Sequence, residues 1–266
     1  MMLGLLLFLS GWIFAEEPKL KPEETIARHL ASIGTLEARN SRKTSVAEGK
    51  ATVKFLVAGS GATAGRALLF SQGRKFRLLL EFDNIHQYLG EDIVFDGEKH
   101  AVGYTVTDSR SPFGEFLHTY NGIIQEGLLG SVLSTVWPLL DLQARRPKLQ
   151  SRGLVKVGGQ QLQQLDYQLK KGRDVNVSLY FDPETFRHVK TIYTVTIAAA
   201  LGTNLQDTSV RETYYKIEET FGAFRTVEGL TVPSQWNIRF SIDGRQSVQW
   251  EWDMRLDKIT SNQPVG

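Results

Sequence analysis

The feature that most constrains the fold is a strict alternation of apolar and polar residues near the end of the chain. Every second residue is apolar from Trp236 to Ile242, and the pattern returns from Val248 to Leu256 after a turn at Asp243-Gly244. A β-strand points successive side chains to opposite faces, so each run has one face for a core and one for water. This pattern is typical of an antiparallel sheet with one solvated side.

Runs of the same kind, bounded by glycine, proline or aspartate, predict strands over most of the chain. The expected strands cover residues 46–58, 66–71, 75–82, 92–95, 101–107, 155–157, 165–169, 175–181, 189–197, 236–242 and 248–256. Consecutive hairpins would give a meander of about nine to eleven strands. The fold class is therefore mainly β with α, and a sheet this wide is expected to curl into an open, incomplete antiparallel barrel.

The glycine-rich run from Gly59 to Gly65 predicts the flexible tip of a hairpin. A dinucleotide-binding loop of similar composition would need a helix after it, so that the pyrophosphate meets the helix N-terminus. A strand follows here, which argues against a nucleotide site.

Two segments have helical patterns. Residues 22–34 predict an amphipathic helix, with Pro22 in the first turn, Ile26, Leu30 and Ile33 on one face, and Gly34 as a left-handed stop. The second segment, Pro112 to Leu142, lies between the two β-rich halves. From Gly127 onward its apolar residues are spaced by three and four, as on one face of a helix, and Pro138 should break or kink it. We expect two short helices there.

The first fifteen residues are predicted to be a signal peptide, followed by a single domain over residues 16–266. Met2 to Phe14 is almost entirely apolar and ends at Ala15, before Glu16 and Glu17. The run is too short for a membrane span of roughly 20 residues. We expect an exported protein, with the periplasm as its compartment and no integral membrane span after cleavage. An uncleaved anchor is the alternative.

Charge and cysteine content exclude several partners. The formal net charge is +2, and residues of both signs are mixed along the chain. Nucleic-acid binding needs a patch of one sign, so we expect no nucleic-acid partner. The chain has no cysteine, which excludes disulfides and thiolate ligands.

The sequence offers little for catalysis. The five histidines lack the spacing of metal ligands, so we expect no metal and no cofactor, with His29 and His118 flanking helices and His188 entering a strand. Glu218 and Glu219 are adjacent and should point to opposite faces of a strand. No Gly-x-Ser-x-Gly motif occurs. These observations predict a protein that is not an enzyme, with a hydrolase as a third possibility.

Three segments resemble a known superfamily. They are residues 128–141, the stretch Leu179-Tyr180-Phe181-Asp182-Pro183-Glu184-Thr185, and the stretch from Phe224 to Pro233 that contains Val-Glu-Gly-Leu-Thr-Val-Pro. With the predicted signal and first helix, the chain resembles the outer-membrane lipoprotein-sorting (LolA/LolB-like) superfamily and, within it, uncharacterised exported bacterial proteins. The resemblance implies a half-barrel around a hydrophobic cavity, closed by helices, that carries acyl chains of lipoproteins or glycolipids.

The candidate binding residues follow from the apolar faces, because three short helices supply few partners for so wide a sheet. The concave side would then be a trough for an apolar lipid or acyl chain, which an envelope protein could deliver or receive. A dry, fully packed core and a protein-docking or sensor module with an empty trough are the alternatives. The expected lid residues are Phe113, Phe116, Leu117, Leu129, Leu133, Val136 and Trp137. The expected floor residues are Trp236, Ile238, Phe240, Trp250 and Trp252.

Overall fold

The computed structural model describes residues 19–83, 88–106, 108–172, 174–198, 212–245 and 247–263. The expected signal peptide at residues 1–15 lies outside these ranges. Twelve strands are present, with these bounds: β1 Thr44–Val57, β2 Gly61–Gln72, β3 Lys75–Phe82, β4 Gly90–Phe95, β5 His100–Val102, β6 Lys148–Val157, β7 Gln160–Gln168, β8 Asn176–Phe181, β9 His188–Ile197, β10 Thr213–Val227, β11 Leu230–Asp243 and β12 Val248–Ser261.

The helices are short and fall into two groups. Two precede the first strand, α1 at Pro22–Ile33 and α2 at Leu36–Ser41. The others lie between β5 and β6: α3 Pro112–Thr119, α4 Gly122–Gln125, the 3₁₀ turns η1 Ser131–Leu133 and η2 Pro138–Leu140, and α5 Leu142–Arg145. We call residues 112–145 the lid. Within the described ranges, none of the helices has the length and apolar character that a bilayer crossing requires.

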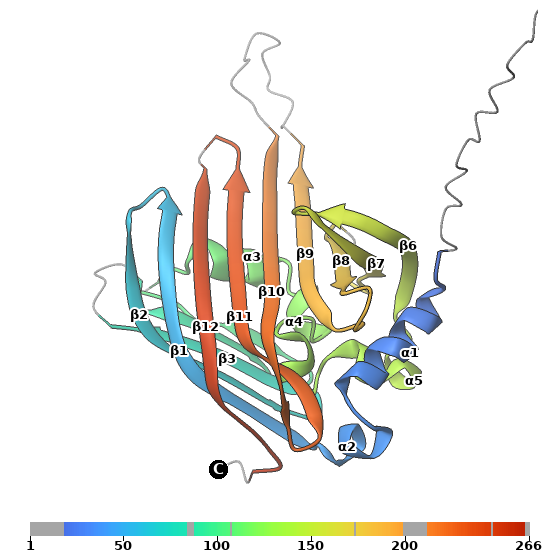
Figure 1. The fold of residues 1–266 in the computed structure, drawn as a ribbon. Coiled ribbons are helices and arrows are strands. Elements are labelled where there is room, and N and C mark those ends of the chain that lie inside the picture. The colour runs from blue at the N-terminus through green and yellow to red at the C-terminus, as the bar shows by residue number, and fades with distance from the viewer. Residues whose placement is uncertain are drawn as a thin grey trace, which may run out of the picture.

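The strands form one antiparallel sheet in the order β5-β4-β3-β2-β1-β12-β11-β10-β9-β8-β7-β6. The first and last strands in the sequence, β1 and β12, pair near the middle, and β5 and β6 are the two edges. The lid connects these edges, so it must cross the whole sheet. Figure 1 shows the sheet curved around α3 and α4, so the crossing runs over the concave side.

The curvature has a local contribution in the β1–β12 pair. The register shifts between the Glu48–Lys258 and Lys50–Arg255 pairs, because two residues of β12, Leu256 and Asp257, lie opposite Gly49 alone, which is a β-bulge in β12. A Cβ on Gly49 would lie 1.9 Å from the carbonyl oxygen of Arg255, so only glycine fits this close approach. Bulges strengthen the local twist and bend the strand. The pair in the middle of the sheet can therefore curl around the lid.

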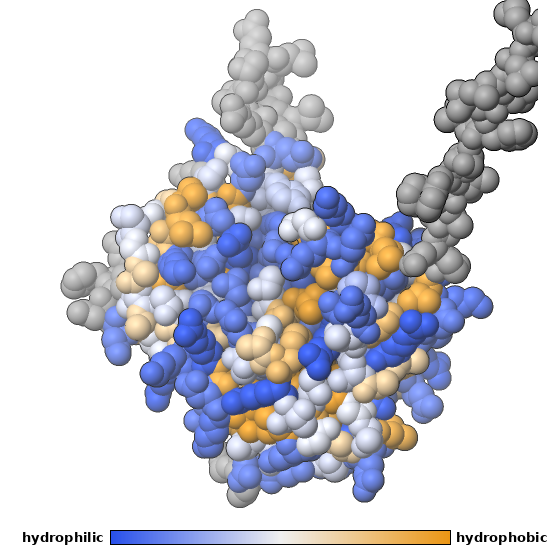
Figure 2. Space-filling model, viewed as in Figure 1, coloured by the Kyte–Doolittle hydropathy of each residue, from blue (hydrophilic) through white to orange (hydrophobic). Residues whose placement is uncertain are grey.

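The interior is one continuous hydrophobic cluster contributed by the concave face, the lid and α1. The opposite face of the strands is solvated. Figure 2 shows this side of the molecule as mostly hydrophilic, with hydrophobic residues in separate patches. The alternation that predicted one-sided strands is thus the alternation between core and water.

Several predictions are confirmed and others need correction. The open antiparallel half-barrel with helices is confirmed, but it has twelve strands, because β10 has no counterpart among the expected runs. Gly61 to Gly65 belong to β2, so the hairpin tip is shorter than expected. Gly34 ends α1 with a φ of 152°, positive but extended rather than left-handed helical.

The helical prediction after Gly127 is wrong. Residues 127–140 form turns and 3₁₀ segments, although nearly all of them are buried. Gly127 and Gly130 have φ values of 69° and 78°, which end any regular helix. The spacing by three and four came from burial on several sides, because the lid is enclosed by the curved sheet.

Candidate ligand-binding site

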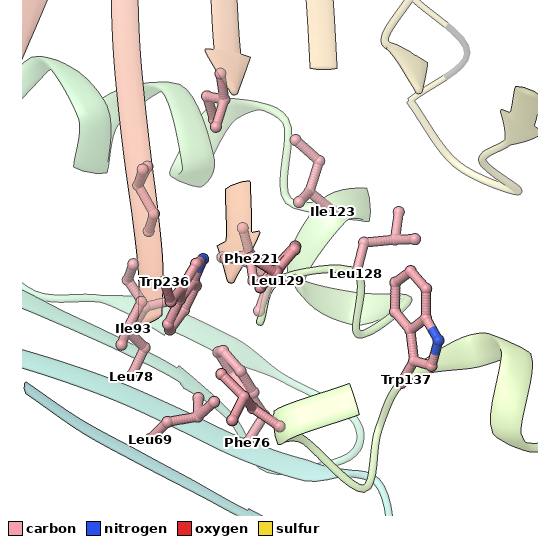
Figure 3. Packing of buried hydrophobic residues seen from close by; sticks show 14 of the residues in the cluster. Leu69, Phe76, Leu78, Ile93, Ile123, Leu128, Leu129, Trp137, Phe221 and Trp236 are labelled. Atoms are coloured by element: carbon pink, nitrogen blue, oxygen red, sulfur yellow. The ribbon is translucent and has the colours of Figure 1, made fainter. Parts of the chain in front are cut away.

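The lid and floor residues that the sequence singled out meet in one cluster. Eleven of the twelve are at most 3% exposed, and Trp250 is half-buried. The Phe113 ring lies 4.8 Å from the Trp252 ring and 5.7 Å from the Phe240 ring, measured between centroids. Figure 3 shows Leu128, Leu129 and Trp137 of the lid among Phe221 and Trp236 of the sheet. At these positions the lid itself occupies the concave face, so a ligand here must displace it.

Side chains in and just before β1 donate hydrogen bonds to backbone carbonyls of the lid. Arg42, just before β1, donates from Nη1 to the Val132 carbonyl at 2.9 Å and from Nη2 to the Ser134 carbonyl at 3.1 Å. Ser45 donates to the Leu133 carbonyl at 2.8 Å. These carbonyls belong to η1 and the turn after it, where regular helical partners are missing. The lid is therefore attached by discrete hydrogen bonds as well as by packing.

Three further hydrogen bonds anchor the turn that follows η1. Ser71 of β2 accepts the Thr135 amide at 2.8 Å, through Oγ. Arg145 of α5 donates to the carbonyls of Glu126 at 3.3 Å and Val136 at 3.0 Å. The bonds of Arg145 are internal to the lid and tie its C-terminal end to its middle.

Beneath the lid lies the fully buried carboxylate of Glu219 on β10. Its Oε1 accepts the Gly130 amide and the Trp236 indole N–H, each at 2.9 Å, and its Oε2 accepts the Tyr193 hydroxyl at 2.7 Å. Burial raises the pKa of Glu219 to about 7, although these three donors act in the opposite direction. A group that titrates near neutral pH thus connects the lid backbone to the sheet.

A second buried carboxylate lies at the β4 side. Glu91 accepts hydrogen bonds from the Tyr88 hydroxyl at 3.0 Å and from the Ser111 hydroxyl, which caps α3. The Trp252 indole donates to the Tyr88 oxygen at 2.7 Å. Burial raises the pKa of Glu91 to about 7. The N-terminus of α3 is thereby fixed to both the floor and β4.

Two histidines complete the polar interior. His29 was expected to flank a helix, but it lies within α1 on the buried side. His29 is buried, with Nδ1 3.0 Å from the Phe186 carbonyl and Nε2 accepting the Trp137 indole N–H at 3.3 Å. A carbonyl can only accept, so Nδ1 carries the proton. Burial lowers the pKa of His29 to about 4. His188 begins β9 as expected. Its Nδ1 lies 2.6 Å from the Ser131 Oγ, and its Nε2 lies 3.0 Å from the Thr191 Oγ1.

Glu219 and Glu91 were not among the predicted site residues, but the alternation could have revealed them. Glu219 lies between Ile217 and Phe221 at an inward position of β10, and Glu91 precedes Ile93 in the same way on β4. An acidic residue at a core position requires partners. The expectation that Glu218 and Glu219 face opposite ways is confirmed: Glu218 pairs with Lys190 and Lys216 on the outer side.

The described residues bring no group of three or more His, Cys, Asp or Glu side chains together in a way that could hold a metal ion. The largest side-chain clusters of the interior are aromatic and aliphatic. The chemistry that this arrangement supports is the burial of apolar groups beside a small number of hydrogen-bonding groups.

No protein-family model and no curated protein matches the chain. Among solved structures it is similar to a DUF1329 family protein from Desulfovibrio piger (10% identity, 92% of this chain and 94% of that one, TM-score 0.47). It is also similar to a putative outer membrane lipoprotein-sorting protein domain from Vibrio parahaemolyticus (10% identity, 91% of this chain and 95% of that one, TM-score 0.43). A third similar structure is a LolA superfamily protein from Nitrosomonas europaea (11% identity, 90% of this chain and 94% of that one, TM-score 0.44).

Two of these structures bear the name of the superfamily that the sequence resembles. The overlap extends over most of both chains but is loose, and it carries no information about a ligand, a partner or an activity. The class defined by the architecture is an open antiparallel half-barrel whose concave face is covered by an irregular lid.

Proposed function

We propose that this chain is a non-catalytic binding protein that holds an apolar chain, such as the acyl chain of a lipid or lipoprotein, between the lid and the concave face of the sheet. The proposal includes the predicted signal at residues 1–15 and export of the domain to the periplasm. The lid and floor residues are those deduced from the sequence, and Trp137 and Trp236 both belong to the buried cluster.

One observation carries the proposal: the lid crosses the concave face without contributing a strand to the sheet. Its neighbours in sequence are the edge strands β5 and β6, which pair on one side only. Among the described residues, lifting the lid would break twelve side-chain hydrogen bonds to distant parts of the chain, those from Arg42, Ser45, Ser71 and Glu219 included, but no hydrogen bond between two strands. The apolar face beneath it would then be available.

The energies are compatible with such a movement. Each hydrogen bond contributes about 1 kcal/mol net, so releasing the twelve bonds costs roughly 12 kcal/mol. An acyl chain gains about 0.8 kcal/mol for each buried methylene, so about sixteen methylenes gain roughly 13 kcal/mol. The apolar side chains of the lid, which opening would expose to water, must also regain apolar contacts by packing on the ligand. A long apolar chain can therefore exceed the cost of opening, while a short one cannot.

The competing function is a protein-docking or sensor module of the envelope. The observation in its favour is the closed interior, in which the lid side chains already fill the floor positions. Mass spectrometry of organic extracts from native protein distinguishes the two functions. Co-purified lipid supports a carrier, and a clean extract favours a docking module.

A reversible lock on the lid gives the sharper test. The Thr135 amide nitrogen lies 2.8 Å from the Ser71 Oγ, so the lid and β2 are in direct contact at these two residues, which are the positions to replace with cysteine. The chain has no other cysteine, so Ser71→Cys with Thr135→Cys can form only this bond. We expect the oxidised protein to lose uptake of a fluorescent fatty acid and the reduced protein to regain it.

Each single-cysteine variant serves as the control for the substitutions themselves. Equal uptake by the oxidised and reduced forms would contradict a lid that opens. A substitution such as Leu133→Asp is a poorer test, because Leu133 is fully buried and an unpaired carboxylate there would damage the core.

A further inference from the structure

A cationic cavity, outside the apolar interior, opens where the lid meets the sheet. Its volume is about 380 Å³, within the usual range for small-ligand sites. Residues from four places surround it: the start of β1, the β2–β3 turn, the lid and the end of β7. The charged residues that line it are Arg42, Lys43, Arg74, Arg145, Lys170, Glu126 and Asp141.

The charge of this cavity is strongly one-sided. Five of its residues are cationic and two are acidic, whereas the whole chain has a net charge of only +2. In the part of the chain that the structure describes, none of the five cations forms an ion pair with a carboxylate.

The two carboxylates in the cavity are occupied by other groups. Glu126 accepts the Tyr167 hydroxyl at 2.7 Å and the Lys170 backbone amide at 2.5 Å. Asp141 accepts the Ala144 amide at 3.1 Å, as the cap of α5. Neither carboxylate forms an ion pair with a side-chain cation among the described residues, and five cations against two carboxylates leave an excess of positive charge.

The arginines are held in place while the other cations are free to move. Arg42 and Arg145 are fixed by their bonds to lid carbonyls, and each guanidinium has further N–H groups beyond those it uses. Burial lowers the pKa of Arg145, and the charge of Arg74 lowers it further. Lys43, Arg74 and Lys170 are exposed and can close on a ligand.

We propose that this cavity binds an oxyanion of the phosphate class, with Arg42 and Arg145 as its fixed walls and Lys43, Arg74 and Lys170 as its mobile contacts. Guanidinium groups present paired N–H donors that match phosphate oxygens, and lysine adds a flexible point charge. A bound anion would relieve the repulsion among the cations. The site stands on its own charges and does not depend on an apolar ligand.

The phosphate could come from solution or from the headgroup of a lipid whose chain lies under the lid. Thr135 and Arg145 line the cavity and belong to the lid, so a headgroup here would lie at the rim of the proposed apolar site. The two sources share their chemistry, and the binding experiment separates them.

The test is calorimetric titration of the full chain with inorganic phosphate, for wild type, Arg74→Gln, Lys170→Gln and the double variant. Both side chains are exposed and make no hydrogen bond within the described residues, so folding should be unaffected. We expect each substitution to weaken phosphate binding about three-fold and the pair about ten-fold, with weaker binding at higher salt. Lys156→Gln, an exposed cation outside the cavity, is the matched control and should change nothing.

A second arm uses a single-chain lipid with a phosphate headgroup and the neutral lipid with the same chain. Weaker binding of the phosphate lipid alone by the double variant identifies a headgroup as the source. Weaker binding of inorganic phosphate, with both lipids unchanged, identifies free phosphate. If neither inorganic phosphate nor the phosphate lipid distinguishes the double variant from Lys156→Gln, the oxyanion site is refuted. Failure of both lipids to bind would refute the carrier function and leave the phosphate arm readable.

Discussion

The Gly130 amide donates to the Glu219 carboxylate at 2.9 Å, across 89 positions of sequence. Gly130 is in the turn before η1 of the lid, and Glu219 is at an inward position of β10. A buried, ionisable group of the sheet therefore holds the backbone of the lid directly. This bond connects the stability of the closed state to pH.

Removal of the Glu219 carboxylate should change the pH dependence of unfolding. Its pKa is raised to about 7 by burial, above the ordinary value of 4.5 that applies when the chain is unfolded. The folded state then keeps a proton that the unfolded state has lost, so the free energy of unfolding falls as pH rises from 4.5 through about 7. The loss is on the order of 3 kcal/mol.

Urea unfolding of wild type and Glu219→Gln between about pH 5 and pH 8 measures this contribution as a difference in slope. The amide keeps an oxygen acceptor for Gly130 and does not titrate. Glu218→Gln is the control, because that neighbour points outward and its pKa is lowered by Lys190 and Lys216. Equal slopes for wild type and Glu219→Gln would disprove the assignment.

Replacement of Arg42 should loosen the lid selectively. Arg42→Met keeps the aliphatic stem and removes the two donors to the Val132 and Ser134 carbonyls. We expect the free energy of unfolding to fall by about 1–3 kcal/mol and hydrogen exchange to become faster at lid amides such as Leu133 and Ser134. Lys43→Met, on the adjacent exposed residue, should leave exchange unchanged. Uniformly faster exchange over the strands would indicate global destabilisation instead.

His29 should remain neutral well below the pH at which free histidine titrates. Its pKa is lowered to about 4 by burial, from 6.5. Because the unfolded state takes up a proton first, this histidine reduces stability as pH falls from 6.5 toward 4. NMR of the ring nitrogens should show protonated Nδ1 and bare Nε2 at about pH 6. A ring that titrates near 6.5 would contradict the buried position.

Gly127 and Gly73 offer a matched pair for the tight turn of the lid. Both have left-handed φ values, 69° and 55°. A Cβ on Gly127 would lie 2.4 Å from the Val136 carbonyl oxygen, whereas a Cβ on Gly73 would meet no atom within 4 Å. Gly73→Ala should lower the free energy of unfolding by the backbone strain alone, about 1 kcal/mol, and Gly127→Ala should lower it by clearly more. Thermal unfolding of both variants measures the two stability losses. Equal losses would mean that the turn at Gly127 moves to accommodate the added methyl group.

The strands were the predictable part of the fold, because the side-chain period of two follows from strand geometry alone. Trp236, Phe240 and Trp252 were assigned to the core side for this reason, and all three are fully buried. The lid was harder to predict. Apolar spacing by three and four usually indicates a helix, but here the lid is surrounded by a curved sheet and needs apolar residues in nearly every direction.

For the polar groups of the interior, too, the sequence predicted one feature and missed another. The sequence placed Glu218 and Glu219 on opposite faces, yet it could not identify Gly130, Tyr193 and Trp236 as the partners of Glu219. Likewise, the basic residues of the cationic cavity are far apart in the chain, from Arg42 to Lys170, and no local pattern connects them.

The sequence by itself determined the class of structure: one-sided strands, an apolar central segment and a mixed-charge exterior. Only the tertiary structure decided that β1 pairs with β12, which makes β5 and β6 the edges and sends the lid across the concave face. The physical reason is range. Alternation and turn chemistry act between neighbouring residues, whereas pairing, burial of charge and cavity walls depend on contacts between residues distant in the chain.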